Sequence, residues 1–553
     1  MSAFKSNLNP AFRSKFSEDI FNHKYRHEGA ETWDALAKTL IDDVCGDLLT
    51  AEENEQLIQY VRELKFIPGG RYLYYAGRPN KFFNNCYLLK AEEDSREDWA
   101  NLSWKAENCL MTGGGIGVDY SVYRASGSPI AKTGGQASGP IPKMNMLNEI
   151  GRRVMQGGSR RSAIYASLNW KHGDIHEFLA AKDWANMPVG KTGKTLWDIK
   201  QDDFNFPAPL DMTNISVNYD TEWLLNYVFM KNVRQAMQSA EPGFSFNFFD
   251  KENETLRNAC TEVTSADDSD VCNLGSINMG RITDIDEMSD IVALGTKFLI
   301  CGTLKAKLPY DKVYETREKN RRLGLGLMGM HEWLIQRGSN YTVTPELHSW
   351  LSVYRGVSDK VSRETADKFG ISRPVANRAI APTGSIGILA GTSTGVEPIF
   401  AVAYKRRYLK GNSRWVYQYV VDSAAQELID RYGAKPETVE SALDLADDYE
   451  RRMAFQADVQ DYVDMSISST INLPAWGSKL NNEGTVENFA NTLAKYAPRL
   501  RGFTCYPDGS RGGQPMTAIP YQEAVDKLGE EFDEHVETHD ICDISGTGGS
   551  CGV

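Results

Sequence analysis

The sequence predicts a largely parallel α/β fold built around one large unit. Beyond residue 210, helical stretches alternate with short strand-like runs, a pattern that favours a parallel α/β architecture over an all-α or all-β one. Between about residues 66 and 168, short apolar segments are separated by glycine clusters, which is typical of loops that let a ligand approach the backbone. At 553 residues the chain exceeds one ordinary domain, yet a large α/β barrel with appended helices can contain most of it.

The N-terminal region, residues 1–65, is predicted to be helical. Thr50 and Glu53 form a capping box ahead of four apolar residues at helical spacing, Leu57, Ile58, Val61 and Leu64. Further helices are expected at 221–240, 284–304 and 344–369, and a strand at 377–381 that leads into a turn. We therefore predict that the large α/β unit covers 66–515 and is followed by a flexible tail over 516–553.

The bulk composition excludes several classes of partner. A formal net charge of −13 and a pI near 5.3 argue against nucleic acid or an anionic membrane as the main partner. An acidic chain of this kind can still contain a local basic pocket for phosphates. No apolar run is long enough to span a bilayer, and the first residues carry no apolar signal-peptide core. The simplest expectation is a cytoplasmic protein that acts on a small molecule.

The nine cysteines favour reduced thiols over a disulfide framework, because their number is odd and no secretory signal is present. No pair of C-x-x-C knuckles occurs, so a structural zinc ribbon is not expected, and we predict no metal ligands on this chain. His172 and His176 lie four residues apart, but a glycine lies between them and a third ligand is lacking, so a structural role is favoured over a metal site.

The most informative segment is NACTE at 258–262. In an extended segment, alternate side chains point to one face, which would bring together the amide of Asn258, the thiol of Cys260 and the carboxyl of Glu262. A carboxylate can remove a proton, an amide can hold an oxygen, and a sulfur can carry a nucleophilic lone pair or an unpaired electron. Taken alone, the segment also fits a loop cysteine with polar neighbours.

Four further cysteines suggest relay chemistry. Cys86 and Cys272 lie in distinctive surroundings, NNCYLL and VCNLGSIN, although each alone also fits a buried inert thiol. Cys542 and Cys551 lie on a tail rich in glycine and serine and could carry reducing equivalents to an oxidised pair by thiol–disulfide exchange. The alternative for the tail is a zinc site formed by His535, His539 and Cys542.

Two glycine-containing runs indicate nucleotide contacts. The run APTGSIG at 381–387 places small residues and free backbone N–H groups at a strand-to-helix turn, which suits a phosphate. It lacks the Lys-Ser/Thr ending of a P-loop, and a simple tight turn remains the alternative. The run GGGIG at 113–117 lacks dinucleotide-binding spacing and favours close backbone approach to a sugar or base.

In this order, the segments resemble the catalytic subunit of ribonucleotide reductase, and most closely the adenosylcobalamin-dependent class II enzymes. The resemblance runs from about residue 66 to 513. Each motif is weak alone, but nine in family order are highly specific. They are PGGR (68–71), GGGIG (113–117), ASGP (137–140), QGGSRR (156–161), NACTE (258–262), CNLGSIN (272–278), PTGSI (382–386), SSTINLP (468–474) and YPDGSR (506–511).

The resemblance implies a fold and a radical mechanism. The implied fold is a ten-stranded α/β barrel of two five-stranded parallel halves, antiparallel to each other, with a central finger loop that presents Cys260. Cys260 would become a thiyl radical that abstracts the 3'-hydrogen of the ribose, and Glu262 would take the 3'-hydroxyl proton as general base. Asn258 would hold the substrate hydroxyls. Cys86 and Cys272 would deliver two electrons as water leaves, and Cys542 and Cys551 would exchange away the resulting disulfide.

The resemblance also assigns substrate contacts and partners. Substrate binding falls to Asn85, Gly114, Gly115, Thr383, Gly384, Ser385 and Ile386, the last four at the phosphates. The partners it implies are a ribonucleotide substrate, a thioredoxin-like or dithiol reductant, and a nucleoside triphosphate effector at a homodimer interface. The chain departs from the family in two respects: no ATP-cone precedes the barrel motifs, and eight residues separate the tail cysteines instead of a close pairing.

The expected cofactor is adenosylcobalamin, because a cofactor must carry radical generation. Class I enzymes receive the radical from a metal-containing partner subunit through adjacent tyrosines near the last barrel strand. That strand, at 502–507, holds one tyrosine here, and the doublet Tyr74-Tyr75 lies in another part of the chain. A class I-like subunit that depends on such a partner is the alternative.

Two other functions fit the sequence less well. A non-radical thiol–disulfide oxidoreductase would leave Asn258, Glu262 and the phosphate turn unexplained, and a silent nucleotide-binding subunit would require the loss of a reactive residue.

Overall fold

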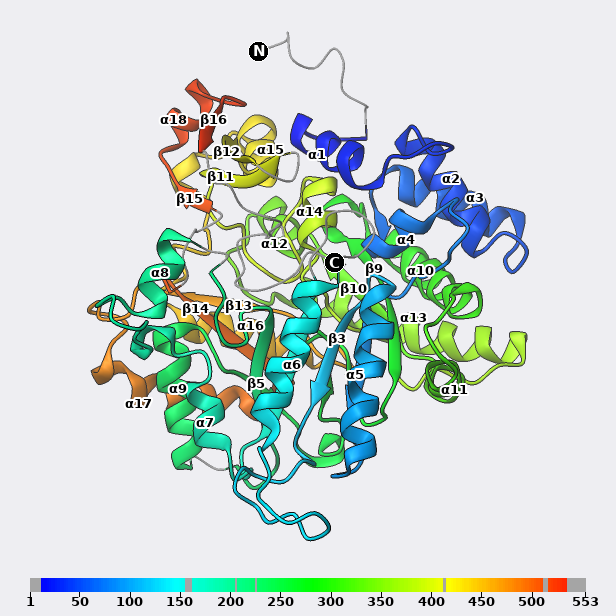
Figure 1. Cartoon of the computed structure of the whole chain (residues 1–553). Coiled ribbons are helices and arrows are strands. Elements are labelled where there is room, and N and C mark those ends of the chain that lie inside the picture. The colour runs from blue at the N-terminus through cyan, green and yellow to red at the C-terminus, as the bar shows by residue number, and fades with distance from the viewer. Residues whose placement is uncertain are drawn as a thin grey trace.

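The computed structural model describes residues 11–154, 162–203, 206–223, 226–410, 414–510 and 516–534. Its centre is a ten-stranded sheet covered by helices on the outside (Figure 1). Five of these strands run parallel in chain order: β2 (Cys86–Lys90), β3 (Gly115–Asp119), β4 (Ile164–Asn169), β5 (Thr213–Tyr219) and β6 (Gly243–Phe246). Helices connect successive strands, among them α5 (Arg96–Met111), α6 (Pro140–Arg153), α7 (Ile175–Ala180), α8 (Leu196–Asp202) and α9 (Tyr227–Ser239).

A second group of strands joins the first group at both ends. Strand β9 (Asp270–Asn278) is antiparallel to β2, and β14 (Gly502–Pro507) is antiparallel to β6. Between them, β10 (Leu323–Met328) is parallel to β9, and β13 (Thr470–Leu473) is parallel to β14. Parallel bridges from Leu325 to Arg378 and from Ile380 to Ile467 connect these two pairs.

The predicted α/β class is confirmed by this mixed sheet. The exact division into two five-stranded halves remains a prediction, because β1 (Phe66–Pro68) adds an antiparallel strand beside β9, and residues 377–381 form isolated bridges instead of the predicted regular strand. The turn that follows is as predicted, since α14 (Gly384–Ala390) begins directly after Thr383.

Over its described residues, 11–65, the N-terminal region is mainly helical as predicted, with α1 (Lys15–Ile20), α2 (Trp33–Val44) and α3 (Ala51–Arg62); α4 (Gly70–Tyr75) follows β1. The capping box of Thr50 and Glu53 is present at the start of α3. The apolar faces of these helices share one buried core with α10 (Ile285–Lys305), α12 (Met330–Gln336) and α13 (Pro345–Phe369). The N-terminal helices therefore pack against the main fold, and a boundary at residue 65 stays a proposal.

The C-terminal part corrects one prediction. Residues 516–534 were expected to begin a flexible tail, yet they form β15 (Met516–Ala518), α18 (Tyr521–Asp526) and β16 (Glu531–Glu534). Strands β15 and β16 flank the hairpin of β11 (Ala403–Lys410) and β12 (Arg414–Val421) in a four-stranded sheet. The ladder hydrogen bonds and the buried Ala524 hold this segment in place, which the polar composition of the chain end concealed.

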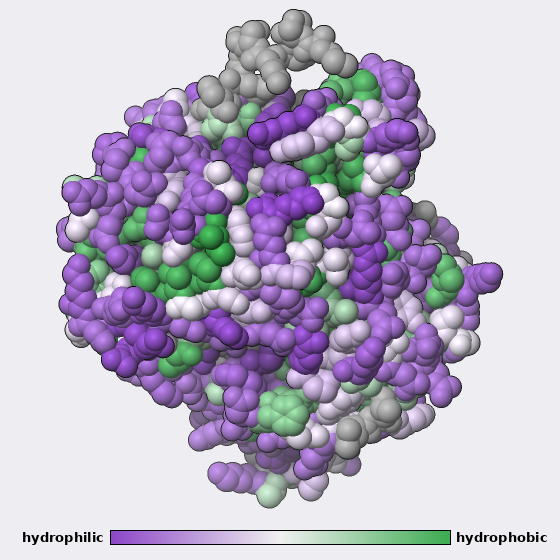
Figure 2. All heavy atoms as spheres, turned by 180° about the vertical axis from the view of Figure 1, so that it is seen from behind, coloured by the Kyte–Doolittle hydropathy of each residue, from purple (hydrophilic) through white to green (hydrophobic). Residues whose placement is uncertain are grey.

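The remaining helices complete the outer layer: α11 (Asp311–Asn320), α15 (Ser423–Tyr432), α16 (Tyr449–Gln460) and α17 (Val486–Tyr496). Within the described ranges, no helix is both long and apolar enough to cross a membrane. The face opposite the view of Figure 1 is mainly hydrophilic, with separate hydrophobic areas (Figure 2).

Candidate active site

A hairpin at the centre of the fold carries the segment 258–262. Its two short strands are β7 (Leu256–Arg257) and β8 (Thr264–Ser265), paired antiparallel. The segment between them is a tight turn and not the extended run predicted from the sequence: Thr261 has a left-handed φ of 72°, and its N–H donates to the Asn258 carbonyl at 3.0 Å. Because β7 and β8 are antiparallel, the chain reverses direction between them. The turn, and not the alternation of an extended strand, therefore sets the positions of Asn258, Cys260 and Glu262. We call residues 254–265 the finger loop.

Glycines of β3 make room for the finger loop. A Cβ at Gly117 would lie 1.7 Å from the carbonyl oxygen of Arg257, and a Cβ at Gly115 would lie 3.0 Å from the Cβ of Ala259. A side chain at residue 117 is therefore incompatible with the observed backbone position. The glycine-rich run predicted to admit a ligand admits part of the protein itself.

The three predicted reactive cysteines lie in one apolar cluster. Cys86 and Cys272 are direct neighbours across the antiparallel strands β2 and β9, and both are thiols in the structure. Such neighbours have Cα atoms about 4.5–5.5 Å apart, within the range of about 4.4–6.8 Å that a disulfide requires. Cys260 is buried in the same cluster, with Val263, Leu88 and Met465. The strands thus bring together residues that lie far apart in the sequence.

Asn258 connects the finger loop to Cys86. Its Nδ2 donates to the Cys86 sulfur at 2.9 Å, while its Oδ1 accepts the Val263 N–H at 2.9 Å. The amide is fully buried, so both contacts are made without competition from water. Asn258 consequently fixes the shape of the turn and the orientation of the Cys86 thiol.

Burial dominates the electrostatics of this site. It raises the pKa of Glu262 to about 7; the nearby Asn258 amide lowers the pKa only in part, because within the described residues no donor reaches hydrogen-bond geometry with either carboxyl oxygen. Burial and the neighbouring Glu262 also raise the pKa of Cys272 well above its usual value. A carboxyl group that titrates near neutrality suits a general base, and a thiol that keeps its proton can supply hydrogen.

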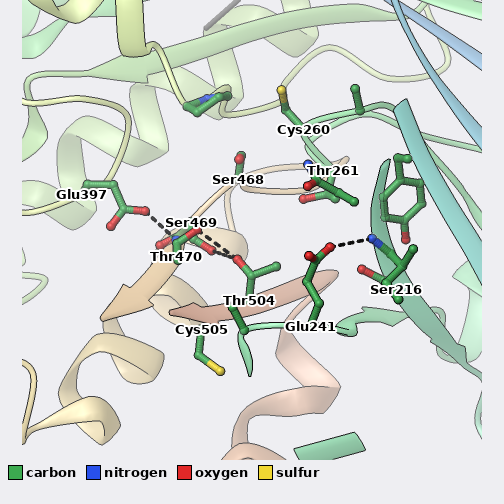
Figure 3. Close-up of a pocket in the computed structure, with 16 residues that line it drawn as sticks. Ser216, Glu241, Cys260, Thr261, Glu397, Ser468, Ser469, Thr470, Thr504 and Cys505 are labelled. Carbon is green, nitrogen blue, oxygen red and sulfur yellow. Dashed lines mark hydrogen bonds between the residues drawn. The ribbon is translucent and has the colours of Figure 1, made fainter. Parts of the chain in front are cut away.

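A cavity opens beside Cys260 (Figure 3). It contains about 630 Å3 of empty space, part of it open to solvent, and none of its lining residues is basic. Cys260 and Thr261 border it from the finger loop, and Ser468, Ser469, Thr470 and Thr504 present hydroxyl groups from the segment around β13 and β14. Sequence reasoning assigned no role to these hydroxyl residues, although 468–474 was one of the family motifs.

The carboxylates of the cavity wall are both paired. Glu397 forms an ion pair with Arg452 and accepts the Thr470 N–H at 2.7 Å, and Glu241 pairs with Lys182 at 2.5 Å. The hydroxyl of Tyr165 is buried in the same wall and meets no hydrogen-bond partner at normal geometry within the described residues. The cavity therefore offers neutral polar groups to a ligand, with its charges already neutralised.

The predicted phosphate turn lies next to this cavity, which Pro382 lines. Thr383 adopts a left-handed conformation and its side chain does not cap α14; instead its hydroxyl accepts the Gly395 N–H at 2.8 Å. The N–H groups of the first turn, at Gly384, Ser385 and Ile386, remain without a side-chain cap. Lys24, which sequence reasoning missed, donates to the Ser385 hydroxyl at 3.1 Å. Lys24 lies in the π-helical turn Phe21–Tyr25 directly after α1, which packs against α14, and its sequence context carries no motif.

The other predicted residues differ in their surroundings. Both polar side-chain atoms of Asn85 are buried and lack a hydrogen-bond partner within the described residues, so both are able to bind a ligand. A Cβ at Gly114 would lie 2.4 Å from the Tyr87 ring, so packing alone requires that glycine. Cys542 and Cys551 lie outside the described residues. Both ring nitrogens of His172 are used by the Tyr123 carbonyl and the Asp174 N–H, in agreement with the structural role predicted for it.

The fold and the site define an α/β enzyme class with a buried cysteine on a central loop, a neighbouring thiol pair and a carboxyl group poised near neutrality. The family model for the ribonucleotide reductase barrel domain matches residues 84–191, 228–348 and 360–500. The chain belongs to the ribonucleotide reductase family.

Two curated relatives illustrate the similarity. The vitamin B12-dependent ribonucleoside-diphosphate reductase of Mycobacterium tuberculosis (strain CDC 1551 / Oshkosh) is 26% identical over 535 residues, which covers 86% of this chain and 75% of that protein. A reductase of the same name from Thermoplasma acidophilum is 27% identical over 522 residues, with 83% and 66% covered.

Two solved structures share the fold. The Actinobacillus ureae class Id ribonucleotide reductase alpha subunit has a TM-score of 0.69 at 17% identity and covers 90% of this chain and 97% of its own. A B-12 dependent, class II ribonucleotide reductase has a TM-score of 0.69 at 16% identity and covers 95% of each chain.

Proposed function

We propose that this protein reduces ribonucleotides to 2'-deoxyribonucleotides by a thiyl-radical mechanism with adenosylcobalamin as initiator, for DNA precursor synthesis. The observation that carries the proposal is the meeting of Cys260, Cys86 and Cys272 in one buried cluster beside Glu262. The relatives named as vitamin B12-dependent reductases support this cofactor over a radical from a metal-containing partner subunit.

Each of five residues in or beside this cluster has its own role in the proposed reaction. Cys260, as a thiyl radical, takes the 3'-hydrogen of the ribose, and Glu262 accepts the proton of the 3'-hydroxyl. Cys86 and Cys272 each give up one hydrogen and become a disulfide, while the 2'-hydroxyl leaves as water and the 2'-carbon gains a hydrogen. Asn258 orients Cys86 through the contact of 2.9 Å between its Nδ2 and the Cys86 sulfur. At this distance from Cys86, its amide is placed to hold a substrate hydroxyl. Burial of the whole cluster protects the radical from solvent.

The polar, uncharged lining of the cavity beside Cys260 suits the nucleoside part of adenosylcobalamin. When bound, this cofactor supplies the initial radical. The hydroxyl groups of Ser469, Thr470, Thr504 and Tyr165 can hydrogen-bond to ribose and adenine. The lining residues include no cation, which disfavours a phosphate there. The residues present thus match an uncharged ligand next to the thiol.

We assign the substrate phosphates to the turn at Thr383, Gly384, Ser385 and Ile386. The uncapped N–H groups of this turn and the ammonium of Lys24 supply donors and positive charge for an anion. Asn85, Gly114 and Gly115 are proposed to border the rest of the substrate. The side chain of Asn85 supports this through its unsatisfied polar atoms.

A homodimer with an effector nucleotide at its interface completes the proposal. Large apolar side chains are exposed on the neighbouring helices α5 and α6: Trp104 by 50%, Met111 by 63% and Met146 by 50%. Exposed apolar residues gathered on adjacent helices favour a protein interface. We further propose a cytoplasmic enzyme whose disulfide is reduced by a dithiol or thioredoxin-like protein through Cys542 and Cys551.

Reconstitution tests this function. The purified chain with adenosylcobalamin, a dithiol and a ribonucleoside di- or triphosphate should form the corresponding deoxyribonucleotide, measured by chromatography. The Cys260→Ser variant should form none. Activity that requires a second, metal-containing subunit and is indifferent to adenosylcobalamin would contradict the cobalamin assignment while keeping the reductase.

A further inference from the structure

Arg257 stands directly before the proposed radical segment and is the best-buried arginine near it. Its exposed fraction is 1%, and within the described residues no carboxylate forms an ion pair with it. Burial and the neighbouring Arg501 lower its pKa to about 9. A buried charge without an ion-pair partner is costly, so its retention calls for a specific contribution from its contacts.

Those contacts join three separate segments. Nη1 donates to the carbonyls of Glu254 and Leu256 within the finger loop. Nη2 donates to Phe246 O and Asn247 Oδ1 at the end of β6, and to Arg501 O at the start of β14. The pair β6–β14 is one of the two places where antiparallel strands join the parallel groups of the sheet. The guanidinium therefore ties the finger loop to this seam.

The backbone of the same residue is fixed from the other side. The carbonyl of Arg257 occupies the space where a Cβ of Gly117 would lie, against β3. Asn258, the next residue, binds Cys86 and closes the turn that carries Cys260. The stem of the finger loop is thus held between β3 on one side and the β6–β14 seam on the other, and Cys260 lies three residues further along the chain.

We propose that Arg257 is a positioning residue for Cys260. Its guanidinium fixes the position of the finger loop relative to β6 and β14, and so the placement of the Cys260 thiol relative to Cys86 and the substrate. This inference rests on the proposed function for its catalytic consequence only. The placement of Cys260 itself can be measured without turnover. The planar fork of arginine is needed because it reaches acceptors in three directions, which a lysine ammonium on a flexible stem does not reproduce.

The test compares Arg257→Met, Arg257→Lys and the milder Asn247→Ala with a matched control, Arg321→Met. Arg321 is as deeply buried and holds the Thr303 and Ser372 hydroxyls, away from the finger loop. The first readout is the alkylation rate of Cys260 by N-ethylmaleimide in the native full chain, followed by peptide mass spectrometry with the fully buried Cys301 as internal reference. Alkylation of Cys260 should accelerate in Arg257→Met, less in Arg257→Lys and Asn247→Ala, and not in Arg321→Met.

The second readout is the split between kcat and KM for the reductase reaction. A displacement of about 1 Å can cost about 100-fold in rate, so kcat of Arg257→Met should fall by about that factor with KM little changed, and Arg257→Lys should recover part of it. Unchanged Cys260 alkylation in both Arg257→Lys and Asn247→Ala would overturn the inference, even if Arg257→Met fails to fold. Equal changes in Cys260 alkylation and in kcat for Arg257→Met and Arg321→Met would also overturn the inference, because they would show that Arg257 only stabilises the fold. Failure of the proposed function would abolish the second readout and leave the first intact.

Discussion

Glu262 holds its carboxyl group fully buried and without a hydrogen-bond donor among the described residues, an arrangement that costs stability and favours proton transfer. Its pKa is about 7 in the folded protein against an ordinary value of 4.5. The folded state therefore binds this proton more tightly than the unfolded state, and stability falls as pH rises from about 4.5 to 7. Above pH 7 the loss is on the order of 3 kcal/mol, from about 1.36 kcal/mol per pKa unit.

Glu262→Gln should consequently stabilise the protein at pH 8 and inactivate it. The amide removes the ionisation cost, so the free energy of unfolding in denaturant titrations should rise by up to about 3 kcal/mol at pH 8, with a smaller gain at pH 5. Loss of the general base should lower kcat by about 10²- to 10⁴-fold, and wild-type kcat should increase with pH toward about 7. A variant less stable than wild type at pH 8 would contradict the buried, unsatisfied carboxylate.

The Cys86 and Cys272 pair should limit turnover when no external reductant is present. In a Cys542→Ser, Cys551→Ser background, each chain should form a single deoxyribonucleotide and then contain a Cys86–Cys272 disulfide, detected by peptide mass spectrometry. Cys86→Ser in that background should form none, whereas Cys109→Ser, a buried cysteine of α5, should behave as the background does. Continued turnover without reductant would exclude this pair as the electron source.

At this scale, the sequence identified Cys260, Glu262, Asn258, Cys86 and Cys272 because their residue types and motif order are distinctive. It did not identify Lys24, Tyr165 or Arg257. Lysine, tyrosine and arginine are common, and the significance of these three comes from burial and from contacts with segments distant in the chain. No periodicity or spacing encodes such contacts.

At the scale of the elements, the finger loop depends on a glycine in the strand beside it. Gly117→Ala places a Cβ on the Arg257 carbonyl, so the loop must shift and kcat should fall by about 100-fold, as expected for displacement by about 1 Å. Gly356→Ala is the control, because a Cβ there meets nothing within 4 Å on helix α13, and it should stabilise the protein by about 0.5–1 kcal/mol. Steady-state kinetics and thermal unfolding check both. Full activity of Gly117→Ala would show that the loop is not held against β3.

Sequence patterns predicted the long helices well, because caps and apolar periodicity are local: α10 begins after the Asp284 cap and α13 after the Thr344 cap. Short elements were harder. Residues 258–262 looked extended but form a turn, and 377–381 make only bridges, because neighbouring strands and not local propensity decide their hydrogen bonding. Residues 516–534 looked like a tail, since short strands at a sheet edge carry little apolar signal.

At the scale of the whole molecule, helices α5 and α6 lie on the outer face at the front of Figure 1 and carry the exposed apolar residues proposed to form a dimer. Met111→Glu combined with Trp104→Glu would place charges in that interface and should convert the dimer to a monomer, measured by light scattering after size-exclusion chromatography. Leu528→Glu, at a side chain equally exposed elsewhere, should leave the dimer intact. Persistence of the dimer in the double variant would place the interface on another face.

The central claim is that the thiol of Cys260 takes the 3'-hydrogen of a ribonucleotide. The most direct measurement uses a ribonucleotide labelled with tritium at the 3'-carbon, incubated with the full chain, adenosylcobalamin and a dithiol. Wild-type protein should release part of this tritium to water as deoxyribonucleotide forms, because a hydrogen held on a sulfur exchanges with solvent. Cys260→Ser should release none, while keeping its fold and its binding of the nucleotide. Deoxyribonucleotide formation by Cys260→Ser with tritium loss equal to that of wild type would contradict the account.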